Sequence, residues 1–76
     1  MKSSKLQRVQ VIFREVLDDE RLTITGDFSQ NDSSDWDSVA TVQIVLATER
    51  EFGVRLPTEL VAQLKDVGQL LSALPD

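Results

Sequence analysis

The sequence predicts an all-α fold: a small antiparallel four-helix bundle of three main helices and one short helix, with a long loop between the first and second. Apolar residues recur at the period of a helix face in three stretches, two of which follow a capping-box pattern. The 76 residues suffice for a single domain, residues 1–76. Because the chain has no Cys and no His, neither a disulfide framework nor a Cys/His zinc site is expected.

The first helix is predicted over residues 6–17. Ser4 and Gln7 have the spacing of a capping box, in which each side chain satisfies a free amide of the first turn. The acidic run at residues 18–20 ends the pattern, because carboxylates are unfavourable at the negative C-terminal end of a helix. The apolar face comprises Leu6, Val9, Ile12, Phe13, Val16 and Leu17.

Residues 19–37 show no helical period and are rich in Thr, Gly, Asp, Asn and Ser. Connections of this length are uncommon in compact domains and tend to be functional or mobile. We expect Leu22, Ile24 and Phe28 to anchor this loop on the bundle, and Trp36 to pack there as well.

The second helix is predicted over residues 39–52. Asp37 is a good N-cap, since its carboxylate can accept from amides two or three residues further on. Gly53 lies where a left-handed C-cap needs a residue without a Cβ. Pro57 then favours extended backbone before it, and Thr58 is expected to cap the short third helix.

The last helix is predicted to begin after Asp66, which with Gln69 repeats the capping-box spacing, and to be closed by Pro75. Gly68 near its start lowers helix propensity, and the sequence offers no reason for it. The apolar face comprises Val67, Leu70, Leu71 and Leu74.

The second helix is apolar on two sides when its residues are placed at intervals of about 100°. Val39 and Leu46 fall on one strip, with Val42 at its edge, and a core does not need this strip as well as the other face. Such a helix is either deeply enclosed or offers an exposed apolar strip to another molecule. The expected core face comprises Ile44, Val45, Thr48 and Phe52.

The charge of the chain excludes some partners. Thirteen Asp and Glu against eight Lys and Arg give a net charge of −5, which repels nucleic acid and anionic membrane surfaces. The N-terminal residues lead into an amphipathic pattern rather than the apolar core of a signal peptide, and no apolar run reaches membrane-spanning length. The sequence therefore predicts a cytoplasmic monomer with no nucleic-acid or membrane partner.

A catalytic role is not expected. A serine nucleophile needs a base, and without His the usual triad cannot be built. Asp35 and Asp37 could serve acid/base chemistry, but so small a domain is not expected to enclose a water-excluding cleft around them. No catalytic residue is predicted.

Calcium is a second candidate, because oxygen-bearing side chains between Asp27 and Asp35 imitate the ligand spacing of an EF-hand loop. The pattern fails at Asp32, which replaces the turn glycine, and at Ser38, which replaces the bidentate glutamate. No metal ligand is predicted, and a calcium-responsive helical module stays the less favoured alternative.

Ser38 admits two interpretations from its position. It can be an inert serine of the first helical turn, or it can accept a phosphodiester, because free amides and the positive end of the helix dipole suit a phosphate there. Position alone does not separate them.

Two runs flank the second helix. The run from Asp35 to Val39 reads Asp-Trp-Asp-Ser-Val, and the run from Glu51 to Pro57 reads Glu-Phe-Gly-Val-Arg-Leu-Pro. They resemble the acyl carrier protein family, whose pattern is Asp-Ser-Leu opening a helix that ends in Glu-Phe-Gly, an aliphatic residue, any residue, an aliphatic residue and Pro. Both parts match at the expected separation, with Val39 as a smaller aliphatic residue in place of Leu, and the size, acidity and helix order agree as well.

The resemblance implies that Ser38, preceded by Asp37, receives 4′-phosphopantetheine from coenzyme A through a phosphopantetheinyl transferase. The thiol of that arm would hold acyl or aminoacyl intermediates as thioesters for acyl-loading and acyl-transferring enzymes, in fatty-acid or polyketide biosynthesis. The chain itself would catalyse nothing. An unmodified helical adaptor remains the alternative.

The resemblance also implies a partner surface on the second helix, in which the apolar strip is surrounded by acids. Ala40, Thr41 and Gln43 are neutral where housekeeping fatty-acid carriers tend to be acidic, and Arg50 is basic. These departures favour a dedicated carrier in a specialised pathway. The implied partner-binding residues are Asp35, Val39, Leu46, Glu49 and Glu51.

Overall fold

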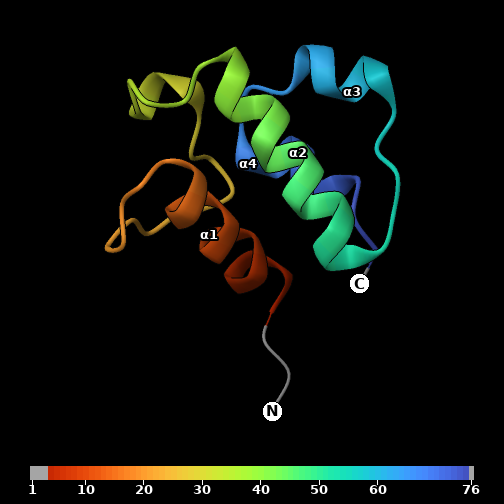
Figure 1. The fold of residues 1–76 in the computed structure, drawn as a ribbon, viewed down its shortest axis with the longest axis horizontal. Coiled ribbons are helices and arrows are strands. Elements are labelled where there is room, and N and C mark those ends of the chain that lie inside the picture. The colour runs from red at the N-terminus through yellow and green to blue at the C-terminus, as the bar shows by residue number, and fades with distance from the viewer. Residues whose placement is uncertain (1–3, 76) are drawn as a thin grey trace.

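The computed structural model describes residues 4–75, which form four α-helices and one short 3-10 helix, with no strand among them (Figure 1). The predicted all-α fold and helix order are confirmed. The last helix is as short as the third, at 6 residues each, so the bundle has two long and two short helices. The elements are α1 Lys5–Val16, η1 Gln30–Asp32, α2 Ser38–Phe52, α3 Thr58–Gln63 and α4 Val67–Ser72.

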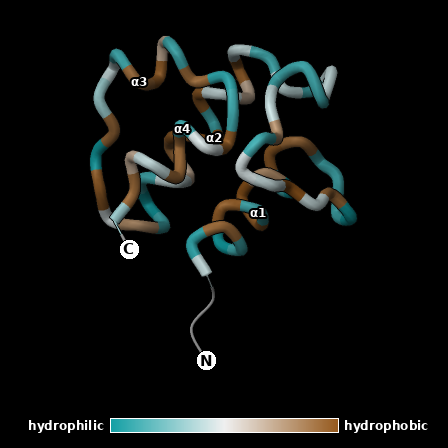
Figure 2. The backbone as a smooth tube through the Cα atoms, turned by 180° about the vertical axis from the view of Figure 1, so that it is seen from behind, coloured by the Kyte–Doolittle hydropathy of each residue, from teal (hydrophilic) through white to brown (hydrophobic). Residues whose placement is uncertain are grey.

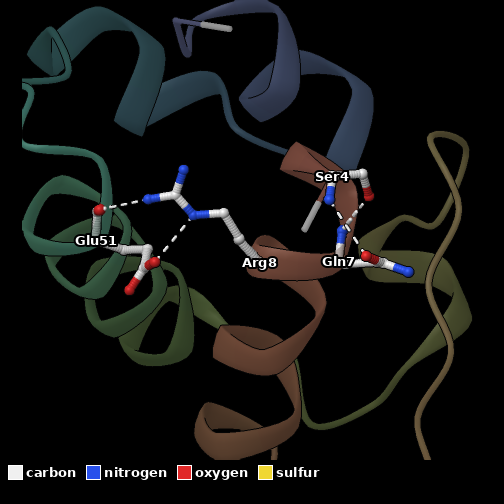
Figure 3. A network of polar contacts seen from close by, with 4 residues as sticks. All are labelled: Ser4, Gln7, Arg8 and Glu51. Carbon is white, nitrogen blue, oxygen red and sulfur yellow. Dashed lines mark hydrogen bonds and ion pairs between the residues drawn. The ribbon is translucent and has the colours of Figure 1, made fainter. Parts of the chain in front are cut away.

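The ends of α1 and α4 follow the predicted capping rules. The Ser4 hydroxyl accepts from the Gln7 amide at 3.1 Å, and the Ser4 amide donates to the Gln7 side chain at 3.2 Å (Figure 3). Asp66 and Gln69 form the second capping box at the start of α4. Both of these boxes are therefore confirmed.

The start of α3 corrects one prediction. Thr58 is the first residue of the helix and not its cap, because Pro57 occupies the N-cap position with φ −67° and ψ 148°. The fixed φ of proline suits this extended residue, and its carbonyl accepts from the amides of Leu60 and Val61. No side chain caps α3, so Thr58 has no capping role.

The core lies where α1, α2 and α4 face one another, and apolar positions recur along all four helices (Figure 2). On α2 the predicted core face is confirmed: Ile44, Val45 and Thr48 are buried, and Phe52 is half-buried. The Thr48 hydroxyl is fully enclosed and has no hydrogen-bond partner within residues 4–75. No helix in this range is long and apolar enough to cross a membrane.

The long loop is held against the bundle by its predicted anchors and by backbone bonds. Ile24 is buried, while Leu22 and Phe28 pack against the core. The Phe28 carbonyl accepts from the Val67 amide at 2.9 Å, so part of the loop covers the start of α4. The predicted anchoring of the loop is confirmed.

Gly68 lies close to the backbone of the long loop. Its amide donates to the Gly26 carbonyl at 2.7 Å, and a Cβ built at Gly68 would lie 3.0 Å from the same oxygen. A residue with a Cβ would require this carbonyl to move by a few tenths of an ångström, which disfavours larger residues at this position. This long-range contact gives the reason that the sequence pattern lacked.

Candidate functional site

Ser38 is the first residue of α2, and it is exposed. Asp37 before it is the N-cap, as predicted: its carboxylate accepts from the Ala40 amide at 2.8 Å, and its carbonyl accepts from the Thr41 amide at 3.0 Å. The Ser38 hydroxyl has no hydrogen-bond partner within residues 4–75. The capping geometry therefore fixes the backbone and leaves this hydroxyl available.

Trp36 anchors the segment that precedes Ser38. Its indole N–H donates to the Thr41 hydroxyl at 2.9 Å, and that hydroxyl donates to the Asp37 carbonyl at 3.1 Å. The ring meets Phe13 of α1 edge to face at 5.0 Å between centroids, and it stacks on Phe28 of the loop at 5.9 Å. Only 4% of Trp36 is exposed, which confirms the predicted packing role.

A pocket of ≈ 470 Å³ opens beside Ser38, between the start of α2 and α3. Trp36 and Thr41 form part of its wall, so the contacts that hold the helix start also shape this pocket. Its further lining is partly apolar, and comprises Gln30, Asp37, Val42, Val61, Ala62 and Leu64.

The second apolar strip of α2 is open to solvent. Val39 is 65% exposed, Val42 50% and Leu46 53%. Since large apolar side chains in a row at the surface mark interaction sites, the strip is available to another molecule. It begins next to Ser38 and runs along α2 away from it.

Two residues expected on the exposed side of α2 lie on its inner side. Ala40 and Thr41 are each 5% exposed, so their neutral character says nothing about a partner surface. The sequence could have predicted their burial, because both residues lie four positions before the core residues Ile44 and Val45 and therefore on the same helix face. Among the three neutral residues, only Gln43 is exposed.

The predicted acidic residues divide into two groups. Asp35 is exposed near the start of α2, and its carboxylate has no partner within residues 4–75. At the other end, the Glu49 carboxylate accepts from the Leu56 amide at 2.7 Å, and the Glu51 carboxylate pairs with Arg8 of α1 at 2.9 Å (Figure 3). Sequence reasoning missed Arg8, because no local pattern links residues so far apart.

No group of three or more acidic side chains within residues 4–75 is placed to hold a metal ion. Asp32, one of the residues that suggested calcium, instead closes the 3-10 turn, where its carboxylate accepts from the Ser29 amide at 2.9 Å. The calcium-responsive alternative is not favoured.

Known proteins share both the sequence pattern and the fold. A family model described as "Phosphopantetheine attachment site" matches residues 7–74. An acyl carrier protein of Renibacterium salmoninarum is 46% identical over 46 residues, which are 60% of this chain and 57% of that protein. An acyl carrier protein of Rhodococcus erythropolis is 38% identical over 61 residues, 80% of this chain and 67% of that one.

The fold agrees with a solved structure as well. The holo acyl carrier protein from Geobacter metallireducens, determined in solution by NMR, matches with a TM-score of 0.80 and 29% identity, covering 90% of this chain and 78% of that one. This chain spans little more than half the length of the Renibacterium relative. Since the family model covers nearly all of the residues and the helices superpose on a holo structure, the chain belongs to the acyl carrier protein family.

Proposed function

We propose that this chain carries acyl or aminoacyl intermediates as thioesters on a 4′-phosphopantetheine arm at Ser38, and presents them to the enzymes of a biosynthetic pathway. The observation that carries the proposal is the exposed Ser38 hydroxyl without a partner, at the first position of α2. The match to a phosphopantetheine attachment site and the holo structural neighbour support it.

The residues around Ser38 suit a phosphodiester. The amides of Ser38 and Val39 have no acceptor within residues 4–75, and they lie at the positive end of the α2 dipole. Asp37 directs its carboxylate onto the Ala40 amide, so this charge has a partner within the chain. A phosphate on the Ser38 oxygen would therefore find two free donors in the first turn.

The proposed arm supplies a thiol, which a chain without cysteine lacks. Attachment forms a bond between the Ser38 oxygen and the phosphorus next to the pantetheine and breaks the pyrophosphate bond of coenzyme A, so that adenosine 3′,5′-bisphosphate leaves and the Ser38 proton passes to a base. No base of this chain contacts the hydroxyl within residues 4–75. We therefore assign the base to a phosphopantetheinyl transferase, and the chain to a non-catalytic role.

Docking of acyl-loading and acyl-transferring enzymes would use the residues next to the arm. Val39 and Leu46 present an exposed apolar strip, and Asp35 adds a free carboxylate near its start. Glu49 and Glu51 would contribute by holding the end of α2, because both carboxylates have partners within the chain.

We further infer that the chain is a dedicated carrier rather than a housekeeping one. The exposed positions of α2 from Ser38 to Leu46 include no acidic residue, which gives it a distinctive docking surface. Action as a monomer in the cytoplasm stays a prediction.

Intact mass spectrometry tests the proposal. The purified chain, incubated with coenzyme A and a broad-specificity phosphopantetheinyl transferase, should gain one 4′-phosphopantetheine. Ser38→Ala should gain none, while Ser34→Ala, which removes an exposed hydroxyl of the preceding loop, should gain one. An unchanged wild-type mass would favour the unmodified adaptor, and modification of Ser38→Ala would overturn the site.

A further inference from the structure

The solvent-facing side of α2 ends in a positive charge. Val39, Val42, Gln43 and Leu46 are exposed along it, and none of them is acidic. At about 100° per residue, Arg50 lies within about 20° of Val39 around the helix axis. The exposed strip that begins at the arm therefore leads to an exposed guanidinium group.

An open hollow of ≈ 380 Å³ lies at that end of α2. Leu46, Val54 and Leu56 give it an apolar part, and Arg50 and Arg55 line it as well. Both arginines are exposed, and neither guanidinium group has an ion pair or hydrogen bond within residues 4–75. We call these five residues, together with Glu49, the basic hollow.

Glu49 also lines the basic hollow, but its carboxylate accepts from the Leu56 amide at 2.7 Å and has no ion pair within the described residues. Two guanidinium groups and one carboxylate give the basic hollow a formal charge of +1. A local positive charge stands out in a chain whose net charge is −5. Guanidinium groups recognise carboxylates well, since their fixed donors match both oxygens.

We propose that the basic hollow binds an acidic side chain, next to an apolar one, on the docking surface of a partner enzyme. The inference rests on the proposed carrier function, and it names the chemistry of the partner. Ser38 and Arg50 are twelve positions apart on one helix, which corresponds to roughly 18 Å. A partner seated on this strip would therefore contact the basic hollow at one end and the arm at the other.

Two synthetic amphipathic peptides test this chemistry. Both peptides have leucines at the same positions. The remaining positions are glutamate in one peptide and lysine in the other. Each is titrated into the unmodified ¹⁵N-labelled chain at about 0.15 M salt, where the Debye length is about 8 Å and the net charge of the chain is largely screened. The glutamate peptide should shift the amides of residues 46–56 and bind there roughly tenfold more tightly than the lysine peptide.

Single substitutions test whether the two arginines of the basic hollow bind the glutamate peptide. Arg50→Gln and Arg55→Gln should each weaken the glutamate peptide roughly threefold. Arg21→Gln removes an exposed charge that lies outside the basic hollow, so it should leave the affinity unchanged. All three variants should keep the far-UV circular dichroism spectrum of the wild type, which serves as a check of folding.

Several outcomes would overturn the proposal: no shift in residues 46–56, a lysine peptide that binds there equally well, or arginine variants that bind like the wild type. Shifts of the same amides with chain concentration alone would assign the surface to a second copy. Because the titration uses the unmodified chain, these outcomes do not depend on whether Ser38 accepts the arm, which the mass assay decides separately.

Discussion

The two ends of α2 are fixed by different forces. At the start, Trp36 is buried between Phe13 and Phe28, and it reaches Thr41 through a hydrogen bond. At the end, Glu51 pairs with Arg8 at the surface, where the two side chains are 47% and 37% exposed. The start therefore depends on buried aromatic area, and the end on charges that remain in water.

This difference matches what each end would do. The serine at the start has to keep one position while its hydroxyl stays free, and packing of the preceding residue achieves this without touching the hydroxyl. The other end offers charged groups to a partner, and exposed ion pairs can rearrange at little cost. Stability should accordingly respond strongly to changes at the start and weakly to changes at the end.

The largest effect is expected for Trp36→Ala. Removing a buried tryptophan costs about 3–5 kcal/mol, and a chain of this size has roughly 4–11 kcal/mol in total. The midpoint of unfolding should therefore move to a much lower urea concentration than that of the wild type. Far-UV circular dichroism during urea titration measures this, since the substitution removes the one tryptophan of the chain as a fluorophore.

Trp36→Phe is the matched control, because it keeps an aromatic ring and loses the donor to Thr41. It should be clearly more stable than Trp36→Ala. If Trp36→Ala unfolded at the wild-type urea concentration, the start of α2 would not depend on this side chain.

Much of the start of α2 could be predicted from the sequence. Asp37 could be assigned as the N-cap from a local pattern, and Trp36 packs behind it as expected. The burial of Thr41 was missed, although its hydroxyl links the indole to the Asp37 carbonyl. A side-chain network of this kind is visible only when the loop is folded back on the helix.

The end of α2 was predicted less well. Gly53 could be assigned as a left-handed C-cap from its place after the apolar pattern, and its φ of 64° confirms this. The partners of Glu49 and Glu51 could not, because Arg8 is 43 positions away from Glu51 and the Leu56 amide is a backbone group that carries no residue signal. The sequence shows which side chains are charged, but not which of these side chains already have an ion pair or hydrogen bond within the chain.

A smaller effect is expected for Gly53→Ala. A residue with a Cβ in the left-handed region costs roughly 1–2 kcal/mol, and no heavy atom lies within 4 Å of the added carbon, so strain is the sole cost. The urea midpoint should fall accordingly. Gly26→Ala is the control, since it too has open space and φ is not positive there. Equal midpoints for the two variants would remove the conformational explanation.

The smallest effect is expected for Arg8→Gln. The substitution removes an ion pair to Glu51 at 2.9 Å and a guanidinium group 4.1 Å from the centroid of the Phe52 ring, both at the surface. Exposed pairs of this kind contribute about 0.2–1 kcal/mol. The loss should shrink in 1 M NaCl, where the Debye length is about 3 Å.

A double-mutant cycle with Glu51→Gln separates the carboxylate from the rest of the contact, because Arg8 also donates to the Glu51 carbonyl at 2.8 Å, and that bond survives the substitution. The expected coupling between the two side chains is below about 1 kcal/mol. A coupling of several kcal/mol that persists in high salt would mean that this end of α2 is held as firmly as the start. The Glu51 carboxylate would then be a structural group, and the exchangeable charges at this end would be Arg50 and Arg55 alone.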